Sequence, residues 1–136
     1  MNKKVIRIFI AVCLMIAMTT TAFASTKTYN RDIRFKILTN GHHDYLALHT
    51  NGREVSARIS GHIELIYDTQ TKKYQVSVKD LTFVGDNASK YSYMVKRYSP
   101  SKIHIIIQTD ERDIGYLYYN ADSTGLHKHC INYSGN

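Results

Sequence analysis

The sequence is poor in cysteine. It contains two, Cys13 and Cys130, and Cys13 lies in a leader that we expect to be removed. One remaining cysteine cannot form an internal disulfide, which excludes the small toxins and inhibitors whose folds depend on several such bonds. The rest of the chain is long enough to be held together by burial of apolar side chains. We expect Cys130 either to be a buried small hydrophobic side chain or to form an intermolecular disulfide.

Long apolar runs are also absent. The longest, residues 8–18, has about half of the ~20 residues that a stable membrane anchor needs. It follows a basic segment, residues 3–7, and precedes the small residues Ala22 and Ala24, which is the order of a secretory signal peptide. We therefore predict a cleavable signal peptide at residues 1–24 and one mature domain at residues 25–136, with no stable membrane span after cleavage.

The sequence has no concentrated charge of either sign. The leader carries three of the 18 Lys and Arg residues and none of the 11 Asp and Glu residues, so its removal lowers the net charge from +7 to +4. The longest basic runs beyond it are the pairs Lys72-Lys73 and Lys96-Arg97. A nucleic-acid-binding protein would gather its cations on one face, so we expect no nucleic-acid partner. Weak attraction to anionic cell-wall polymers or lipid headgroups is compatible with this surface.

Catalytic motifs are missing as well. The chain has no Gly-x-Ser-x-Gly turn, no His-Glu-x-x-His pair and no glycine-rich phosphate loop. Carboxylate pairs assembled from distant strands would leave no such pattern. The sequence therefore identifies no catalytic residue, and we expect a protein that is not an enzyme.

What the chain does contain is a two-residue alternation of apolar and polar side chains, which is typical of half-buried strands. Asn51-Gly52 suits a type I′ turn and predicts a hairpin between the strands on either side of it, and Gly61 predicts a bulge or bend. The sequence thus predicts one all-β antiparallel domain of about seven or eight strands, a meander that forms either a closed barrel or a two-sheet sandwich. The predicted strands are residues 32–38, 45–49, 54–67, 73–84, 91–98, 103–109, 114–120 and 126–133.

Histidine offers one candidate site. If the meander closes and its first and last strands pair, five histidines gather at one rim of the barrel: His42, His43, His104, His127 and His129. Residues two apart on a strand share a face, and imidazole is a good ligand for zinc and copper. We therefore predict a candidate metal site at His42, His43, His127 and His129. Cys130 faces the opposite way from the last pair and is not expected to join it.

Tyrosine offers another. All 11 tyrosines lie beyond the leader, and the chain has no tryptophan. Tyr91 and Tyr93 share one face of their strand, and Tyr116 and Tyr118 share one face of theirs. Tyrosine is rigid and amphipathic, which suits contacts with proteins and sugars, although it is also a common strand residue. We predict that these four residues contribute to a ligand-binding surface.

Three functions follow from these observations. The first is a non-enzymatic domain that binds an extracellular protein, glycan or small apolar ligand through the tyrosine-rich surface or a barrel mouth. The second is a metal-binding or metal-dependent protein that uses the histidines. The third is a structural cell-envelope component that self-assembles into a homo-oligomer through an edge strand or Cys130. In each case we expect the protein to be secreted, or to lie at the surface or in the periplasm of a bacterial cell.

Overall fold

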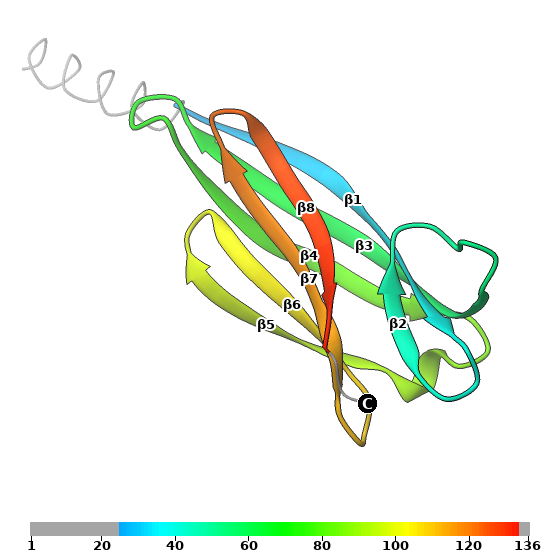
Figure 1. Ribbon diagram of the computed structural model, residues 1–136. Coiled ribbons are helices and arrows are strands. Elements are labelled where there is room, and N and C mark those ends of the chain that lie inside the picture. The colour runs from blue at the N-terminus through cyan, green and yellow to red at the C-terminus, as the bar shows by residue number, and fades with distance from the viewer. Residues whose placement is uncertain (1–24, 134–136) are drawn as a thin grey trace, which may run out of the picture.

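The computed structural model describes residues 25–133 (Figure 1). The expected signal peptide, residues 1–24, lies outside the described residues. Within residues 25–133 there is no helix with the length and apolar character needed to cross a membrane. The description below concerns this β-domain alone.

The domain is a sandwich of two antiparallel four-stranded sheets (Figure 1). Sheet A has the strand order β2-β1-β3-β4, and sheet B has the order β5-β6-β7-β8. The closed-barrel alternative is therefore wrong, and the two-sheet alternative is confirmed. The elements are β1 (Thr26–Thr39), β2 (Asp44–Ala47), β3 (Glu54–Asp68), β4 (Lys73–Val84), the short helix η1 (Ala88–Lys90), β5 (Ser92–Ser99), β6 (Lys102–Gln108), β7 (Asp113–Asp122) and β8 (Gly125–Asn132).

The core lies between the sheets and follows from the alternation in the strands. Alternate residues of β6, starting with Ile103, are fully buried, and those of β1 from Ile33 onward pack against them. The ring of Phe35 meets the ring of Tyr119 edge to face across the core, with centroids 6.3 Å apart. Each large apolar side chain that is fully buried contributes roughly 1.5–3 kcal/mol. This burial holds the domain together without a disulfide.

The Asn51-Gly52 turn forms, but the hairpin predicted around it does not. Asn51 and Gly52 have φ values of 48° and 77°, as a type I′ turn requires, and Arg53 N donates to Thr50 O at 2.9 Å. The strands before and after the turn, however, pair with opposite edges of β1. Leu38 of β1 aligns with Tyr45 of β2 on one edge and with Val55 of β3 on the other. β3 pairs along the whole of β1, which leaves only the other edge of β1 for the short β2. Sheet A is therefore not a meander, whereas sheet B is.

The first and last strands do not pair, which is a second correction to the closed meander. Among the described strands, β8 pairs only with β7. The Asn132 side chain instead joins β8 to β2: it accepts a hydrogen bond from Leu46 N at 2.6 Å and donates to Leu46 O at 3.0 Å. On the opposite side of the sandwich, Arg97 of β5 donates to Val76 O of β4 at 2.7 Å. Side chains thus connect the two sheets where no strand pairing does.

The predicted irregularity at Gly61 is present. The register of β3 and β4 shifts directly after His62, and a Cβ atom at Gly61 would overlap the backbone oxygen of Asp80. Glycine is needed here because the two backbones approach too closely for any side chain. The bend that results places His62 and Asp80 side by side on the outer face of sheet A.

Candidate functional site

The outer face of sheet B is the first candidate site, and the alternation in β7 creates it. Leu117 and Tyr119 point into the core, so Tyr116 and Tyr118 point outward. In the register of the sheet, Tyr118 lies between His104 of β6 and His129 of β8. We call this surface the aromatic face and define it by six residues: Tyr98, His104, Tyr116, Tyr118, His129 and Tyr133.

The rings of the aromatic face form one connected array centred on His104. The His104 ring stacks on the Tyr116 ring, with centroids 4.1 Å apart and an interplanar angle of 10°. The Tyr98 ring lies 4.3 Å from His104 on one side, and the Tyr118 ring lies 5.7 Å away on the other. Tyr118 stacks in turn on His129 at 4.2 Å. These contacts hold the rings in fixed positions before any ligand arrives.

Apolar and aromatic surface remains exposed on this side of the domain. Tyr98 is 50% exposed, and Tyr133, whose ring lies 5.8 Å from that of Tyr116, is also exposed. Met94 and Ile131 share the face and are exposed as well. Exposed apolar residues scattered singly need no explanation, but a contiguous patch marks a binding surface.

Two lysines accompany the rings. Lys102 Nζ lies 5.5 Å from the ring centroids of both Tyr98 and Tyr118, and Lys96 Nζ lies 5.3 Å from that of Tyr98. Burial lowers the pKa of His104, and the charges of Lys102 and Lys96 lower it further. His104 is therefore neutral at pH 7, and the positive charge at the centre of the face is that of the lysines.

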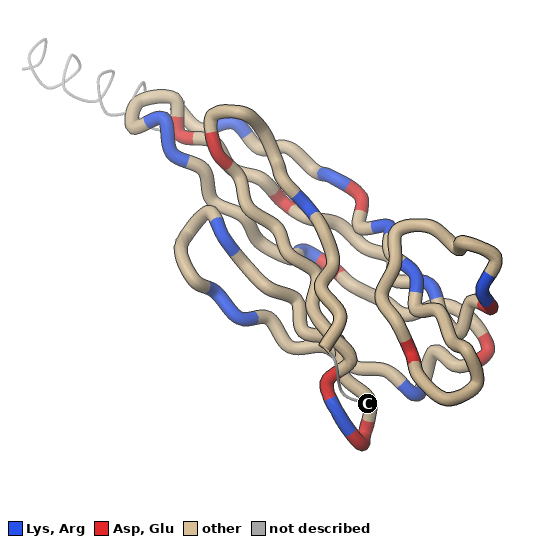
Figure 2. The backbone as a smooth tube through the Cα atoms, in the orientation of Figure 1, with Lys and Arg blue, Asp and Glu red and all other residues tan. Residues whose placement is uncertain are grey.

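The outer face of sheet A carries charged side chains in place of a ring array, and several of them pair with one another. Asp32 accepts a hydrogen bond from Arg34 at 2.7 Å, and His62 lies between Asp32 and Asp80, at 3.4 and 2.8 Å. Along β1, Asp32 is the one acidic residue among several Lys and Arg residues, whereas β3 carries charges of both signs (Figure 2). Such exposed pairs contribute little to stability. The face also carries Lys36 and Arg58, cross-strand neighbours of the same sign, so its charges are only partly balanced.

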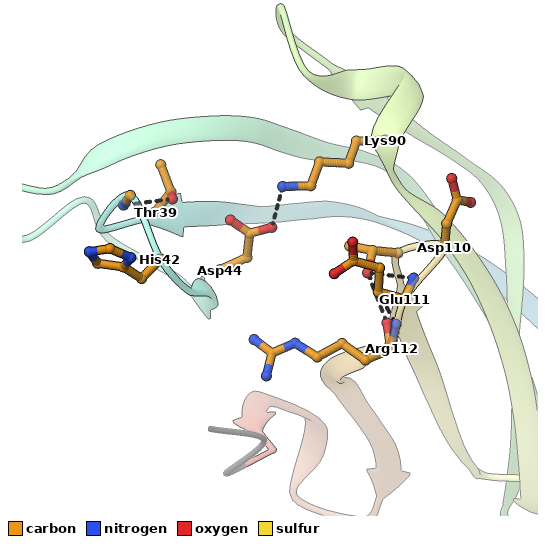
Figure 3. Close-up of a pocket in the computed structure, with 9 residues that line it drawn as sticks. Thr39, His42, Asp44, Lys90, Asp110, Glu111 and Arg112 are labelled. Atoms are coloured by element: carbon orange, nitrogen blue, oxygen red, sulfur yellow. Dashed lines mark hydrogen bonds and ion pairs between the residues drawn. The ribbon is translucent and has the colours of Figure 1, made fainter.

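A polar pocket at one end of the sandwich is the second candidate site (Figure 3). It has a volume of about 260 Å³ and is lined by the β1–β2 turn, Lys90 and the β6–β7 loop. Asp44 and Lys90 face each other across it at 3.1 Å. Only 10% of the Asp44 side chain is exposed, and its carboxylate also accepts a hydrogen bond from the Tyr91 hydroxyl at 3.1 Å. The central carboxylate is thus engaged in fastening β2 to the rest of the fold.

The structure does not bring the predicted metal-binding histidines together. His42 lines the polar pocket and His43 is next to it, whereas His127 lies near the start of β8, beside the β7–β8 turn at the opposite end of the sandwich (Figure 1). The reason is the open sandwich, in which β2 returns along β1 and no strand closes the sheet. Within residues 25–133 no three His, Cys, Asp or Glu side chains are placed to hold a metal ion. Binding of zinc or copper stays a prediction.

His127 and His129 do share a face, but each has a partner of its own. His127 Nε2 lies 3.0 Å from Asp122 and 2.7 Å from the Thr124 hydroxyl. The hydrogen bonds from Thr124, together with that from His127, lower the pKa of Asp122 to about 2. His129 is stacked on Tyr118. His129 therefore belongs to the aromatic face, and His127 is held by residues of the β7–β8 turn.

The four predicted ligand-binding tyrosines are divided by the structure. Tyr116 and Tyr118 lie together on the aromatic face, while Tyr91 is only 6% exposed and belongs to the core. Tyr93 is exposed, but it lies on the other side of sheet B, with its ring 6.5 Å from that of Phe83. Tyr91 therefore makes internal contacts instead of presenting a ring to a ligand.

Cys130 points away from the histidines, as predicted. It is half-buried against the core, and its Sγ donates to Leu46 O at 3.5 Å. Burial raises the pKa of the thiol, which reduces the fraction present as the reactive thiolate. This environment fits the small hydrophobic side chain of the first interpretation.

Comparison with known proteins assigns no family to this geometry. No family model, curated protein or solved structure matches the chain. Because a sandwich fold hosts many unrelated functions, function has to be inferred from the residues of the site.

Proposed function

We propose that the protein is a secreted, non-enzymatic binding domain that holds an extracellular ligand on the aromatic face of sheet B. The proposal rests mainly on one observation: the two outer faces of the sandwich carry different types of side chain. Sheet A presents charged side chains, several of them in ion pairs, whereas sheet B presents a contiguous ring array with exposed apolar neighbours. Contiguous exposed apolar and aromatic surface of this type marks interaction sites in soluble proteins.

The arrangement of the rings supports binding by contact. The tyrosine and histidine rings are held by stacking on their neighbours, so little side-chain entropy is lost when a ligand contacts them. Their faces offer apolar area, while the hydroxyl and imidazole nitrogen atoms offer hydrogen bonds. Such a surface suits a sugar chain or a flat protein surface.

The proposal is tested with a panel of immobilised neutral and acidic oligosaccharides and purified extracellular proteins, probed with residues 25–136. We expect at least one member of the panel to be retained. The double substitution Tyr116→Ala and Tyr118→Ala should weaken this retention by at least about tenfold, because each truncated contact in a binding centre costs about 1 kcal/mol or more.

The matched control replaces two exposed residues of the other outer face, Gln75→Ala and Thr82→Ala. This control should bind as the unchanged protein does, and both double variants should keep the far-ultraviolet spectrum of a β-protein. Equal retention of the tyrosine variant and the control would refute the assignment of the ligand to the aromatic face.

A further inference from the structure

We infer that the ligand of the aromatic face is a polysaccharide chain that carries carboxylate groups. This inference rests on the proposed function and narrows it to one ligand class. It follows from the charges around the rings, from the place of the acidic residues in sheet B, and from the extent of the ring array across neighbouring strands.

No carboxylate faces the centre of the ring array. The groups that surround His104 in the described structure are Lys96 and Tyr98 of β5, Lys102 of its own strand, Tyr116 and Tyr118 of β7, and His129 of β8. None of these side chains is a carboxylate. His62 on sheet A has the opposite environment, between Asp32 and Asp80. Carboxylates thus lie beside His62, whereas the groups around His104 include none.

The acidic residues of sheet B lie at its two ends. Between residues 92 and 132 the sequence has four: Asp110, Glu111, Asp113 and Asp122 (Figure 2). Asp113 accepts a hydrogen bond from the Gln108 side chain at 2.9 Å, and Asp122 is bonded to Thr124 and His127. Lys96 and Lys102 both lie within 5.5 Å of the Tyr98 ring centroid, so this part of the face is positive and attracts an anion.

The array is also extended rather than pocket-shaped. It begins at Tyr98 of β5, crosses β6 and β7, and reaches His129 of β8, and Tyr133 extends it from Tyr116. Neighbouring strands are about 4.8 Å apart, so the rings offer several contact positions in succession across the sheet. A sugar chain can place successive rings on such positions while its carboxylates reach the lysines. A single small anion would leave most of the surface unused.

The test uses polygalacturonate and its fully methyl-esterified form, which share one backbone and differ in charge. Native gels containing each polymer measure how strongly the polymer retards residues 25–136. We expect the acidic polymer to bind at least about tenfold more tightly than the ester, and the preference should shrink in 0.5 M salt.

Two charge variants provide the matched comparison. Lys96→Gln with Lys102→Gln removes two charges from the aromatic face, and Lys73→Gln with Lys79→Gln removes two from sheet A. The first variant should lose about tenfold in affinity for polygalacturonate, because it loses both charges beside the rings, and the second should lose little. Equal losses from both variants would overturn the inference.

The remaining outcomes separate the inference from the proposed function. Equal retardation by both polymers, abolished by Tyr116→Ala with Tyr118→Ala, overturns the carboxylate preference and leaves the binding face in place. Retardation by neither polymer overturns the inference, and the wider panel above then decides the function. Tighter binding to a poly-dT oligonucleotide, or to phosphatidylglycerol vesicles, than to polygalacturonate also overturns it.

Discussion

Two buried tyrosine hydroxyls in the core are in opposite situations. The Tyr91 hydroxyl lies 2.5 Å from Ser56 Oγ and donates to the Asp44 carboxylate at 3.1 Å. The Tyr119 hydroxyl is fully buried and has no hydrogen-bond partner within residues 25–133. An unpaired buried hydroxyl costs about 1–3 kcal/mol relative to a hydrated one, whereas a paired one is nearly free of that cost.

Removing these two hydroxyls should therefore have effects of opposite sign. Tyr119→Phe should leave the free energy of unfolding unchanged or raise it by about 1 kcal/mol, because only an unpaired group is lost. Tyr91→Phe should lower it by about 1–2 kcal/mol, because two hydrogen bonds are lost and Asp44 loses a donor. Urea denaturation of the two variants measures both values. A larger loss from Tyr119→Phe than from Tyr91→Phe would contradict this assignment.

The same residues predict how stability depends on alkaline pH. Burial raises the pKa of Tyr91 to about 12, and burial raises that of Tyr119 as well. Tyrosine in the unfolded chain ionises near pH 10, so the unfolded state loses its protons first. The folded state is then favoured fully below pH 10, and this contribution is lost progressively as the pH rises from about 10 to 12.

We expect the free energy of unfolding to fall between pH 9.5 and 11 by an amount that decreases when Tyr91 and Tyr119 are both replaced by Phe. Urea denaturation at several values of pH measures it, with absorbance at 295 nm reporting tyrosinate in the folded state. An unchanged pH slope in the double variant would show that the two phenols do not carry the effect.

Among the strands, the contact between β2 and β8 depends on one side chain. Asn132 makes two hydrogen bonds to the backbone of Leu46, in a place where a closed barrel would have a strand ladder. Asn132→Ala should lower the free energy of unfolding by about 1–3 kcal/mol and speed hydrogen exchange at the Leu46 amide. Asn30→Ala, on the exposed part of β1, is the control. Full protection of the Leu46 amide in the Asn132 variant would contradict this role.

Within sheet B, the lysines should control the ionisation of His104. Burial has the largest lowering effect on its pKa, and the charges of Lys102 and Lys96 have the next largest effects. Lys102→Gln should therefore raise the pKa of His104 toward its ordinary value, while Lys73→Gln on sheet A should leave it unchanged. NMR titration of the imidazole signals measures the shift. A pKa of His104 that does not move in the Lys102 variant would contradict the electrostatic account of this face.

The sequence correctly predicts which side chains share a face within a strand. The alternation in β7 and β8 correctly puts Tyr116 with Tyr118, and His127 with His129, on one face, and it turns Cys130 the other way. These predictions succeed because the direction of successive side chains is set by the local geometry of the backbone.

Which strands pair with one another is harder to predict from the sequence. Asn51-Gly52 adopts its turn, but it cannot decide whether β3 pairs with β2 or with β1, since that choice depends on contacts far away in the chain. For the same reason the sequence does not predict the ring contacts of His104. Its outward direction follows from its apolar neighbours in β6, yet only the register of β6 with β7 shows that it stacks on Tyr116.

At the scale of the whole molecule, the two outer faces have separate roles. Sheet A carries carboxylates that already have partners, while sheet B exposes rings with two lysines beside them. Both faces rest on one shared core, so variants on either face can be compared with little risk that the fold itself changes. This separation allows binding and stability to be measured independently.

The central claim is that the ligand lies on the aromatic face, and an NMR titration with oligogalacturonate tests it most directly. Addition of the oligosaccharide to residues 25–136 should shift the imidazole signals of His104 and His129 and the ring signals of Tyr116 and Tyr118. The signals of His62 on sheet A and His42 in the polar pocket should stay in place. Shifts confined to His62 or His42, with the signals of the aromatic face unmoved, would contradict the account.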